Sequence, residues 1–340
     1  MIGQRQLNRA LLARQGLLEP FGDPLPRVLE RVGGIQAQYA PSMYVGLWSR
    51  MQALDRDQLT AALEERTAAQ GTLLRGTIHL VSRADYWPFA LVARPSLREW
   101  FTRLSKGEPT AGEIERMAAE LRTALAGGPV TQSMIDEMLG RPARRWINVY
   151  LDLLRVPPSG TWERRRADLY ADAEAELGPP KLTIEEAEEL LLRRYLGGFG
   201  PATRADIASW AGLPVRSVAA VVERVEHVTY QAEDGSTLVD LPDAPLPDPD
   251  LPVPIRFLPT WDATLLVHAR RTQILPERHR PKIFGVKTPF SFPTFLVDGA
   301  VAGTWRYENG RIELTEFESL PPRVRKEVEH AAEPLAAFHA

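Results

Sequence analysis

The spacing of apolar and polar positions predicts a largely helical first third of the chain. Residues 4–15 and 24–38 carry apolar side chains at helical intervals, and the second run ends before Pro41. The β-branched run 73–82 predicts a strand. Further helices are expected over 43–50, 56–67, 83–93, 95–104 and 111–126.

A second pattern begins at Val130 and continues to about Gly178. Residues 131–139 and 143–154 each predict a helix, and 155–171 predicts a strand, a turn and a second strand. The order helix, helix, β-hairpin is typical of a winged helix.

The same order recurs after Thr183, which opens a helix through a capping box. Residues 203–225 predict a helix-turn-helix with Gly212 in the turn. A β-hairpin follows and turns at Asp234-Gly235. This is the clearest helix-turn-helix with a wing in the chain.

The last part of the chain changes from helical to strand patterns. Residues 241–254 are dense in proline and aspartate and predict a stiff, extended linker. Strands are expected over 255–261, 263–269 and 293–317, with hairpin turns at Asp298-Gly299 and Asn309-Gly310. A final helix is expected over 321–339.

These patterns predict an α+β protein with tandem winged-helix domains followed by a small antiparallel β-barrel. The expected boundaries are a first winged-helix unit at 1–127, a second at 128–180, a third at 181–245, and the barrel with the terminal helix at 246–340.

Composition excludes several classes of protein. The chain of 340 residues has no cysteine, so disulfides, thiolate catalysis and Cys-based zinc sites are excluded. It has no apolar run long enough to span a membrane and no signal-peptide pattern, so we expect a cytoplasmic protein. The six histidines show no metal-binding spacing, and no nucleotide-cofactor motif occurs, so we expect catalysis without a metal or cofactor.

The net charge of −3 argues weakly against nucleic-acid binding, but the kind of basic residue argues for it. Of the 41 basic residues only five are lysines, which leaves 36 arginines. A GC-rich genome explains this bias. The planar guanidinium group of arginine can nevertheless donate two parallel hydrogen bonds to a phosphate.

The stretch GGIQAQYAP, residues 33–41, places two amides in an otherwise apolar run. Glutamine does not ionise, so neither side chain is a general acid or base. In a regular helix Gln36 and Gln38 point about 200° apart. They share a pocket only if the backbone is extended or turning there, which Gly33, Gly34 and Pro41 favour. Otherwise the two glutamines are simply polar helix residues.

Six motifs in order carry a resemblance that runs from about residue 4 to residue 338. The chain resembles the winged-helix DNA glycosylase superfamily, and more closely the branch related to the azinomycin-resistance glycosylase. The motifs are GGIQAQYAP, LLRGTIHLVSRADYW, VPPSGTWERRRADLY, YLGGFGPATRADIASWAGL, LPTWDATLLVHARR and FLVDGAVAGTW.

The resemblance implies a C-shaped protein around duplex DNA that acts in base excision repair and antibiotic self-resistance. The family hydrolyses the N-glycosidic bond of alkylated purines, notably N7-alkylguanine, and some members unhook interstrand crosslinks. Its active-site signature is Gln, an apolar residue, then Gln, while a sister branch has Asp at the second position. Gln36-Ala37-Gln38 matches the first form, with an alanine smaller than the usual aliphatic residue. The resemblance therefore makes Gln36 and Gln38 the catalytic candidates.

Two neutral amides suit a lesion that is already cationic. N7-alkylguanine leaves as a neutral base, so the enzyme needs only to hold a water near C1′ and stabilise an oxocarbenium-like sugar. The expected selectivity is for cationic lesions over neutral bases such as uracil. A glycosylase that also cuts the strand uses an amine nucleophile. No lysine lies in a recognised motif, although Lys282 is nearest, so a monofunctional enzyme is expected.

Candidate DNA contacts come from the family motifs and from the basic segment 268–287. This segment contains six Arg and Lys residues and only one acidic residue, Glu277. Alternatives remain open for several of them. His79 is a strand histidine and can be structural, the basic segment can be a solvated hairpin, Trp261 can be core, and Asp262 can orient an arginine or a water. The candidates are Arg75, His79, Arg164, Arg165, Trp261, Asp262, His268, Arg270, Arg271, Arg278, Arg280 and Lys282.

The main alternative function is a non-catalytic winged-helix transcription regulator. It predicts a dimer that reads bases with helix 214–225, which offers few base-reading side chains. A third interpretation is a structural protein whose winged helices bind other proteins. The glycosylase interpretation instead predicts a monomer, no membrane association, and double-stranded DNA carrying alkylated purines as its partner. Alkali-labile sites formed in N7-methylguanine DNA distinguish the enzyme from both alternatives.

Overall fold

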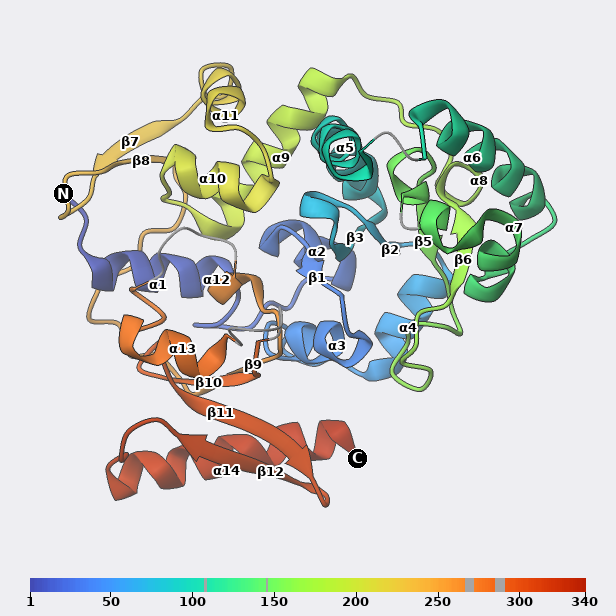
Figure 1. The fold of residues 1–340 in the computed structure, drawn as a ribbon. Coiled ribbons are helices and arrows are strands. Elements are labelled where there is room, and N and C mark those ends of the chain that lie inside the picture. The colour runs from blue at the N-terminus through green and yellow to red at the C-terminus, as the bar shows by residue number, and fades with distance from the viewer. Residues whose placement is uncertain (107–108, 145, 267–271, 285–290) are drawn as a thin grey trace.

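The computed structural model describes residues 1–106, 109–144, 146–266, 272–284 and 291–340. An antiparallel sheet of six strands, in the order β1-β3-β2-β5-β6-β4, runs from the middle of the molecule at β1 toward α6–α8 (Figure 1). The sheet crosses the boundary expected between residues 127 and 128. Its strands are β1 (Ile35–Gln36), β2 (Ala68–Thr72), β3 (Ile78–Ser82), β4 (Val130–Thr131), β5 (Leu153–Arg155) and β6 (Leu169–Asp172).

The two faces of β1, β3 and β2 are buried in different hydrophobic cores, as the alternation of side chains in a strand requires. Val81 and its neighbours on one face join a core with α1, α5 and α9, whereas Leu80 and Ile35 join a second core with α2, α3 and α4. The helices are α1 (Gln4–Arg14), α2 (Leu25–Val32), α3 (Ala40–Trp48), α4 (Arg56–Glu64), α5 (Arg83–Ser105) and α9 (Ile184–Phe199).

The helix-turn-helix predicted after Thr183 is present in the expected order. α10 ends at Ala211 and is capped by Gly212, whose φ of 71° is left-handed, and α11 follows at an angle of 114°. A two-stranded hairpin then turns at Gly235, where φ is 82°. The winged-helix assignment itself stays a prediction. The elements after α9 are α10 (Arg204–Ala211), α11 (Val215–Val222), β7 (Val228–Gln231) and β8 (Thr237–Asp240).

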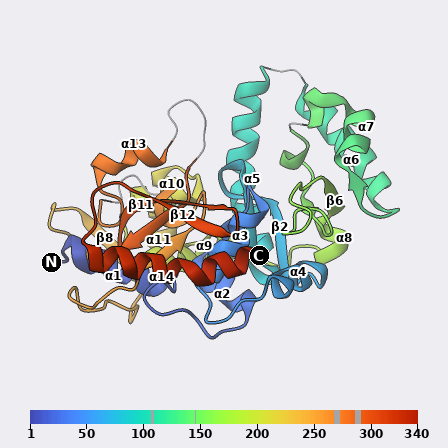
Figure 2. The same ribbon diagram turned by 90° about the horizontal axis from the view of Figure 1, so that it is seen from below.

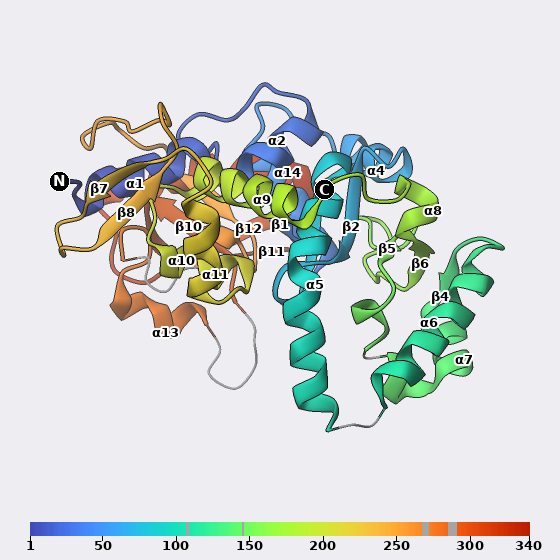
Figure 3. The ribbon, with the colours of Figure 1, turned by 90° about the horizontal axis from the view of Figure 1, so that it is seen from above.

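The segment between α5 and α9 differs from the sequence prediction. The helix expected over 143–154 is wrong for residues 146–154, because a short 3-10 turn at 147–149 is followed there by β5, which pairs with β2. Strand pairing here overrides helical propensity. Figure 3 shows α5 standing between α10–α11 and this segment. Its elements are α6 (Ala111–Leu125), α7 (Gln132–Arg144), η2 (Ile147–Val149) and α8 (Ala173–Leu177).

The described C-terminal strands form an open sheet of four, in the order β12-β11-β10-β9, and the expected closed barrel is not found. The strand expected over 263–269 is also wrong for its described part, because Asp262 accepts from the backbone N–H of Thr264 at 3.0 Å and starts a helical turn. Figure 2 shows α14 lying along this sheet. The elements are β9 (Arg256–Leu258), α12 (Ala263–Leu266), η3 (Glu277–His279), α13 (Arg280–Ile283), β10 (Thr294–Val297), β11 (Ala300–Glu308), β12 (Arg311–Glu316) and α14 (Pro322–His339).

The proline-rich segment 241–254 is held against α1 by arginines. Arg9 donates to the carbonyl of Leu251, and Arg14 donates to that of Pro245. Arg14 also forms a two-pronged ion pair with Asp240 at 2.7 Å, with both side chains only 1% exposed. This pair ties the N-terminal helix to the end of β8.

Within the described ranges, no single helix has the length and apolarity of a membrane span; α10 and α11 together meet that test of length and composition as a bent pair.

We expect Asp240→Asn to lower the free energy of unfolding by about 3–5 kcal/mol, because it leaves the buried Arg14 guanidinium without its counter-charge. Urea unfolding at neutral pH measures this. The matched control is Glu223→Gln, which removes the exposed partner of Arg204 and is expected to cost less than about 1 kcal/mol. Equal effects of the two substitutions would contradict the interpretation.

Candidate active site

Two consecutive glycines end α2 and turn the chain into β1. Gly33 and Gly34 have φ values of 74° and 76°, a left-handed conformation that only glycine adopts without strain. A Cβ at Gly34 would lie 2.9 Å from Cγ1 of Val81, so the position is also sterically closed. The expectation that the helix continues to residue 38 is therefore wrong.

The chain after Gly34 forms the short strand β1, which places both glutamines along β3. Gln36 pairs in register with His79 on β3, and the N–H of Ala37 donates to the carbonyl of Ile78 at 2.7 Å. Ala37 is buried on the side of the second core. Because side chains alternate within the strand, Gln36 projects away from this core, whereas Gln38 follows the strand at a bend and lies against β3 through its contact with Ile78.

The two amides differ in what they contact. The side-chain carbonyl of Gln38 accepts from the N–H of Ile78 at 3.4 Å, and the residue is exposed. Gln36 is half-buried, and its amide makes no hydrogen bond to another described residue. One amide is thus partly fixed by the backbone, and the other keeps both its donor and acceptor groups for a ligand.

His79 supplies a neutral ring beside these amides. It is 3% exposed, and directly opposite residues of an antiparallel pair project to the same side, so its ring lies on the side of Gln36. Its Nδ1 lies 3.0 Å from the carbonyl of Thr77, which requires the proton on Nδ1 and leaves Nε2 as an acceptor. Burial, and then the charge of Arg75, lower the pKa of His79 to about 3. This burial matches the structural role named above for His79, and a role in DNA binding stays a prediction.

Arg75 connects the strand region to the helix-turn-helix. Its backbone is left-handed, with φ of 57°, and its Nη1 donates to the carbonyl of Trp210 at the end of α10. Burial lowers the pKa of Arg75 to about 10, and no carboxylate of the described residues pairs with it. A Cβ at Gly212 would lie 3.0 Å from Cγ of Arg75, so the turn of the helix-turn-helix packs closely on this side chain.

The arginine-rich loop between β5 and β6 is anchored by a buried tryptophan. Trp162 is 6% exposed and packs edge-on against Tyr44 of α3 and Phe338 of α14. Arg164 pairs with Asp168 at 3.2 Å. Arg165 is exposed and donates to the Tyr39 hydroxyl at 3.3 Å, which places it next to the glutamine motif.

Asp262 is removed from the candidate DNA contacts because it is buried. Its carboxylate accepts from Arg50 at 2.9 Å, and both side chains are at most 3% exposed. Of the interpretations offered above, orienting an arginine is the one that this geometry matches. Trp261 beside it is half-buried, with a left-handed backbone and its N–H bonded to Ser291 Oγ at 2.6 Å.

The described part of the basic segment is more neutral than its sequence suggests. Glu318, distant in sequence, accepts from Arg278 at 2.6 Å and from the ring of His279 at 3.0 Å. Arg280 lies 3.9 Å from Glu277, and Lys282 donates to the carbonyl of Phe317. His268, Arg270 and Arg271 lie outside the described residues.

A family model described as DNA glycosylase AlkZ-like matches residues 29–338, which is most of the chain. The chain belongs to the AlkZ-like DNA glycosylase family. The assignment to DNA glycosylases predicted from the sequence is confirmed, and the non-catalytic regulator is set aside.

One curated relative and one solved structure agree with the family. The chain is 24% identical to the interstrand DNA cross-link repair glycosylase of Streptomyces sahachiroi, over 96% of this chain and 95% of that protein. Its fold is similar to that of the Streptomyces sahachiroi DNA glycosylase AlkZ, with a TM-score of 0.79 at 20% identity over 98% and 96% of the two chains. The mixed fold of helices and sheets is thus shared along nearly the whole chain.

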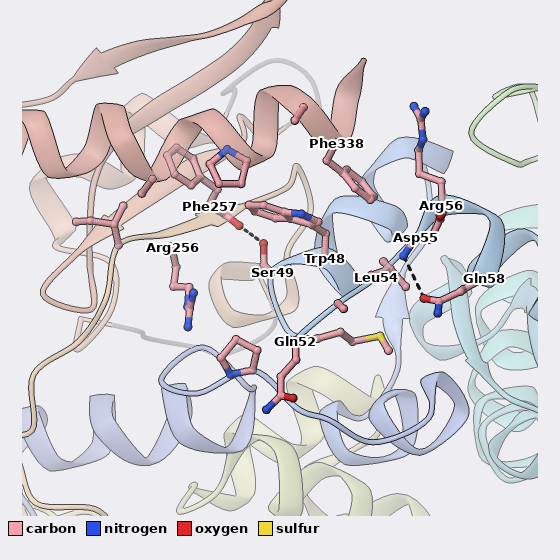
Figure 4. A pocket seen from close by; sticks show the side chains of 17 residues that line it. Trp48, Ser49, Gln52, Leu54, Asp55, Arg56, Gln58, Arg256, Phe257 and Phe338 are labelled. Atoms are coloured by element: carbon pink, nitrogen blue, oxygen red, sulfur yellow. Dashed lines mark hydrogen bonds between the residues drawn. The ribbon is translucent and has the colours of Figure 1, made fainter.

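Two cavities in this family member lie near the end of α14. One of about 780 Å³ lies between the α3–α4 connection, β9 and α14, as Figure 4 shows, and none of the predicted site residues lines it. A smaller one of about 240 Å³ begins at Tyr39 and Pro41, directly after the second glutamine. Its residues from the C-terminal part, Trp305, Tyr307 and His339, lie far away in sequence and were not site candidates, although Trp305 ends the motif FLVDGAVAGTW.

The described residues contain no group of three or more His, Asp or Glu side chains arranged to hold a metal ion.

The low pKa of His79 makes stability depend on pH. The unfolded chain protonates this histidine near its ordinary pKa of 6.5, whereas the folded protein does so only near 3, so stability falls as the pH drops through this range. We expect the loss between pH 7 and pH 5 to be about 2 kcal/mol smaller in His79→Gln than in the wild type, measured by urea unfolding.

The control for this prediction is His330→Gln, whose side chain is 85% exposed and which should keep the wild-type pH dependence. Because each variant is compared with itself at two pH values, a constant change in its stability does not affect the result. Identical pH dependence in His79→Gln and the wild type would show that His79 is not buried as described.

Proposed function

We propose that this protein is a monofunctional DNA glycosylase that hydrolyses the N-glycosidic bond of cationic N7-alkylguanine-type lesions, with the attacking water positioned by Gln36 and Gln38. One observation carries the proposal: both amides lie along β3, Gln38 bonded to Ile78 and Gln36 opposite a histidine that is kept neutral. All three groups are uncharged hydrogen-bonding partners.

An uncharged site suits a substrate that carries the charge itself. A neutral base departs as an anion and needs an acid to protonate it, whereas an N7-alkylated guanine departs as a neutral molecule. The remaining work is to hold a water near C1′ and to accommodate the oxocarbenium-like sugar, and oriented dipoles do this without ionising.

The contacts of the two amides suggest different roles for them. Because the Gln38 carbonyl accepts from Ile78, its NH2 group is the part left to donate to a sugar or phosphate oxygen. Gln36, with both ends of its amide available, is better suited to hold the water through its carbonyl. Nε2 of His79 adds a second acceptor on the same side.

The proposal includes bulky adducts and interstrand crosslinks as substrates. The relative from Streptomyces sahachiroi is named for interstrand cross-link repair, and the alignment with it covers almost all of both chains. Duplex DNA carrying alkylated purines is the proposed partner, and Arg75, Arg164 and Arg165 with the basic segment are its proposed contacts. A monomeric, cytoplasmic enzyme completes the proposal.

We expect Gln36→Ala and Gln38→Ala each to slow release of N7-methylguanine by roughly 10²-fold, because the water loses its orientation. Single-turnover assays that count alkali-labile sites measure the rate. The control is Gln52→Ala, an exposed glutamine outside the site, which should keep the wild-type rate. Unchanged excision in the double glutamine variant would end the proposal.

We expect release of uracil to be slower than release of N7-methylguanine by at least roughly 10²–10⁴-fold, the factor that a general acid contributes when one is present. The two bases are placed at the same position of one duplex and compared in the same assay. Comparable rates would mean that an acid not identified here protonates the departing base.

A further inference from the structure

The cavity that starts at Tyr39 has the chemistry of a nucleotide-binding site. We name it the Tyr39 pocket; its main lining residues are Tyr39, Ser42, Arg165, Trp305, Tyr307 and His339, and its volume is about 240 Å³. It is formed by the start of α3, the β5–β6 loop, β11 and the end of α14. None of these residues has a part in the water-positioning step proposed above.

Rings form one wall of the Tyr39 pocket. Tyr307 stacks on the imidazole of His339, with ring centroids 4.7 Å apart and planes 18° apart, and Trp305 packs edge-on against the same imidazole. Tyr307 is 36% exposed and Tyr39 is 42% exposed, so both rings retain accessible surface. Exposed aromatic faces of this kind are stacking platforms for unpaired bases.

The opposite wall favours an anion. The α3 helix begins at Ala40 without a side-chain cap; Pro41 has no N–H and the N–H of Ser42 donates to the Tyr39 carbonyl, so this end offers the helix dipole and the N–H of Ala40. Arg165 reaches this end and has no carboxylate partner among the described residues, whereas Arg306 at the rim pairs with Glu308 at 2.7 Å. One uncompensated guanidinium and a helix N-terminus together favour a phosphate.

Two buried polar atoms of the pocket lining lack a partner. Ser42 is 3% exposed, and neither its hydroxyl nor Nε2 of His339 makes a hydrogen bond within the described part of the chain. Buried polar atoms are nearly always paired in folded proteins, so unpaired ones at a cavity point to a ligand that pairs with them. A base edge or a phosphate oxygen supplies the missing donor or acceptor.

We propose that the Tyr39 pocket binds one unpaired nucleotide of the DNA, with its phosphate between Arg165 and the N-terminus of α3 and its base against Tyr307. The inference rests on the proposed function in that it takes DNA as the substrate. Its role is to hold a nucleotide that has been displaced beside the glutamine motif.

The test uses undamaged DNA, so that it does not depend on catalysis. Fluorescence anisotropy compares a duplex containing a single unpaired 2-aminopurine with the fully paired duplex. We expect the wild type to bind the unpaired form roughly tenfold more tightly or better and to quench the 2-aminopurine emission by stacking. Equal affinity for the two duplexes would overturn the proposal.

Variants then locate the preference. Tyr307→Ala and Arg165→Ala are expected to bind the paired and unpaired duplexes nearly equally. Two controls are expected to keep the preference for the unpaired duplex. Tyr307→Phe keeps the ring, and Arg311→Ala removes an exposed arginine that pairs with Glu313 outside the pocket. A preference that survives both alanine substitutions, or that is lost equally in Tyr307→Phe and Arg311→Ala, contradicts the assignment to this pocket.

The result is independent of the proposed catalytic step. Gln36→Ala should slow base release as predicted above but keep the preference for the unpaired duplex. If the wild type releases no N7-methylguanine but prefers the unpaired duplex, the proposed reaction is contradicted and nucleotide binding in the Tyr39 pocket is supported. If it releases the base but shows no such preference, only nucleotide binding in the pocket is contradicted.

Discussion

The reversal of the chain at two left-handed glycines is the constraint on which the site depends. A helix carried on through residue 38 would send the two amides to different sides. Gly33 and Gly34 stop the helix at Val32, and the packed side chain of Val81 leaves no space for a larger residue at the second position. The resulting strand is short and depends on its pairing with β3 to stay extended.

The arginines of the chain serve the fold as well as any DNA surface. Arg9, Arg14 and Arg50 have side chains no more than 2% exposed, and each pairs with an aspartate from a distant part of the chain. In all three cases the arginine lies in the first 50 residues and the aspartate after residue 239. Guanidinium groups therefore join the two ends of the sequence, and a surplus of arginine is by itself weak evidence for phosphate binding.

Local signals predicted local structure well. The helix-turn-helix with Gly212, the hairpin turns at Asp234-Gly235 and Asn309-Gly310, and the final helix all have their own caps or turn residues, and they were predictable from the sequence. Features that depend on distant partners were not. The open C-terminal sheet in place of the expected barrel and the pairing of β5 with β2 are set by contacts that no local pattern encodes.

The candidate site shows the same division between local and distant information. The two glutamines were identified through a resemblance, and the glycines beside them indicated that the helix would break. The neutral state of His79 required knowledge of its burial and of the Thr77 carbonyl. Asp262 was named as a candidate DNA contact and is instead the buried partner of Arg50. Whether a single aspartate is buried or exposed cannot be predicted from the sequence around it.

Strands β1–β3 and β4–β6 belong to one sheet, so the segments on either side of residue 127 share their backbone hydrogen bonds. A cut between residues 127 and 128 would strip β2 of its partner β5 and expose a row of backbone donors and acceptors at Gln70 and Gly71. Such an open edge invites pairing with other chains. Neither half is therefore expected to fold correctly alone, because the strands of the glutamine motif and those that flank the arginine-bearing loop belong to one sheet.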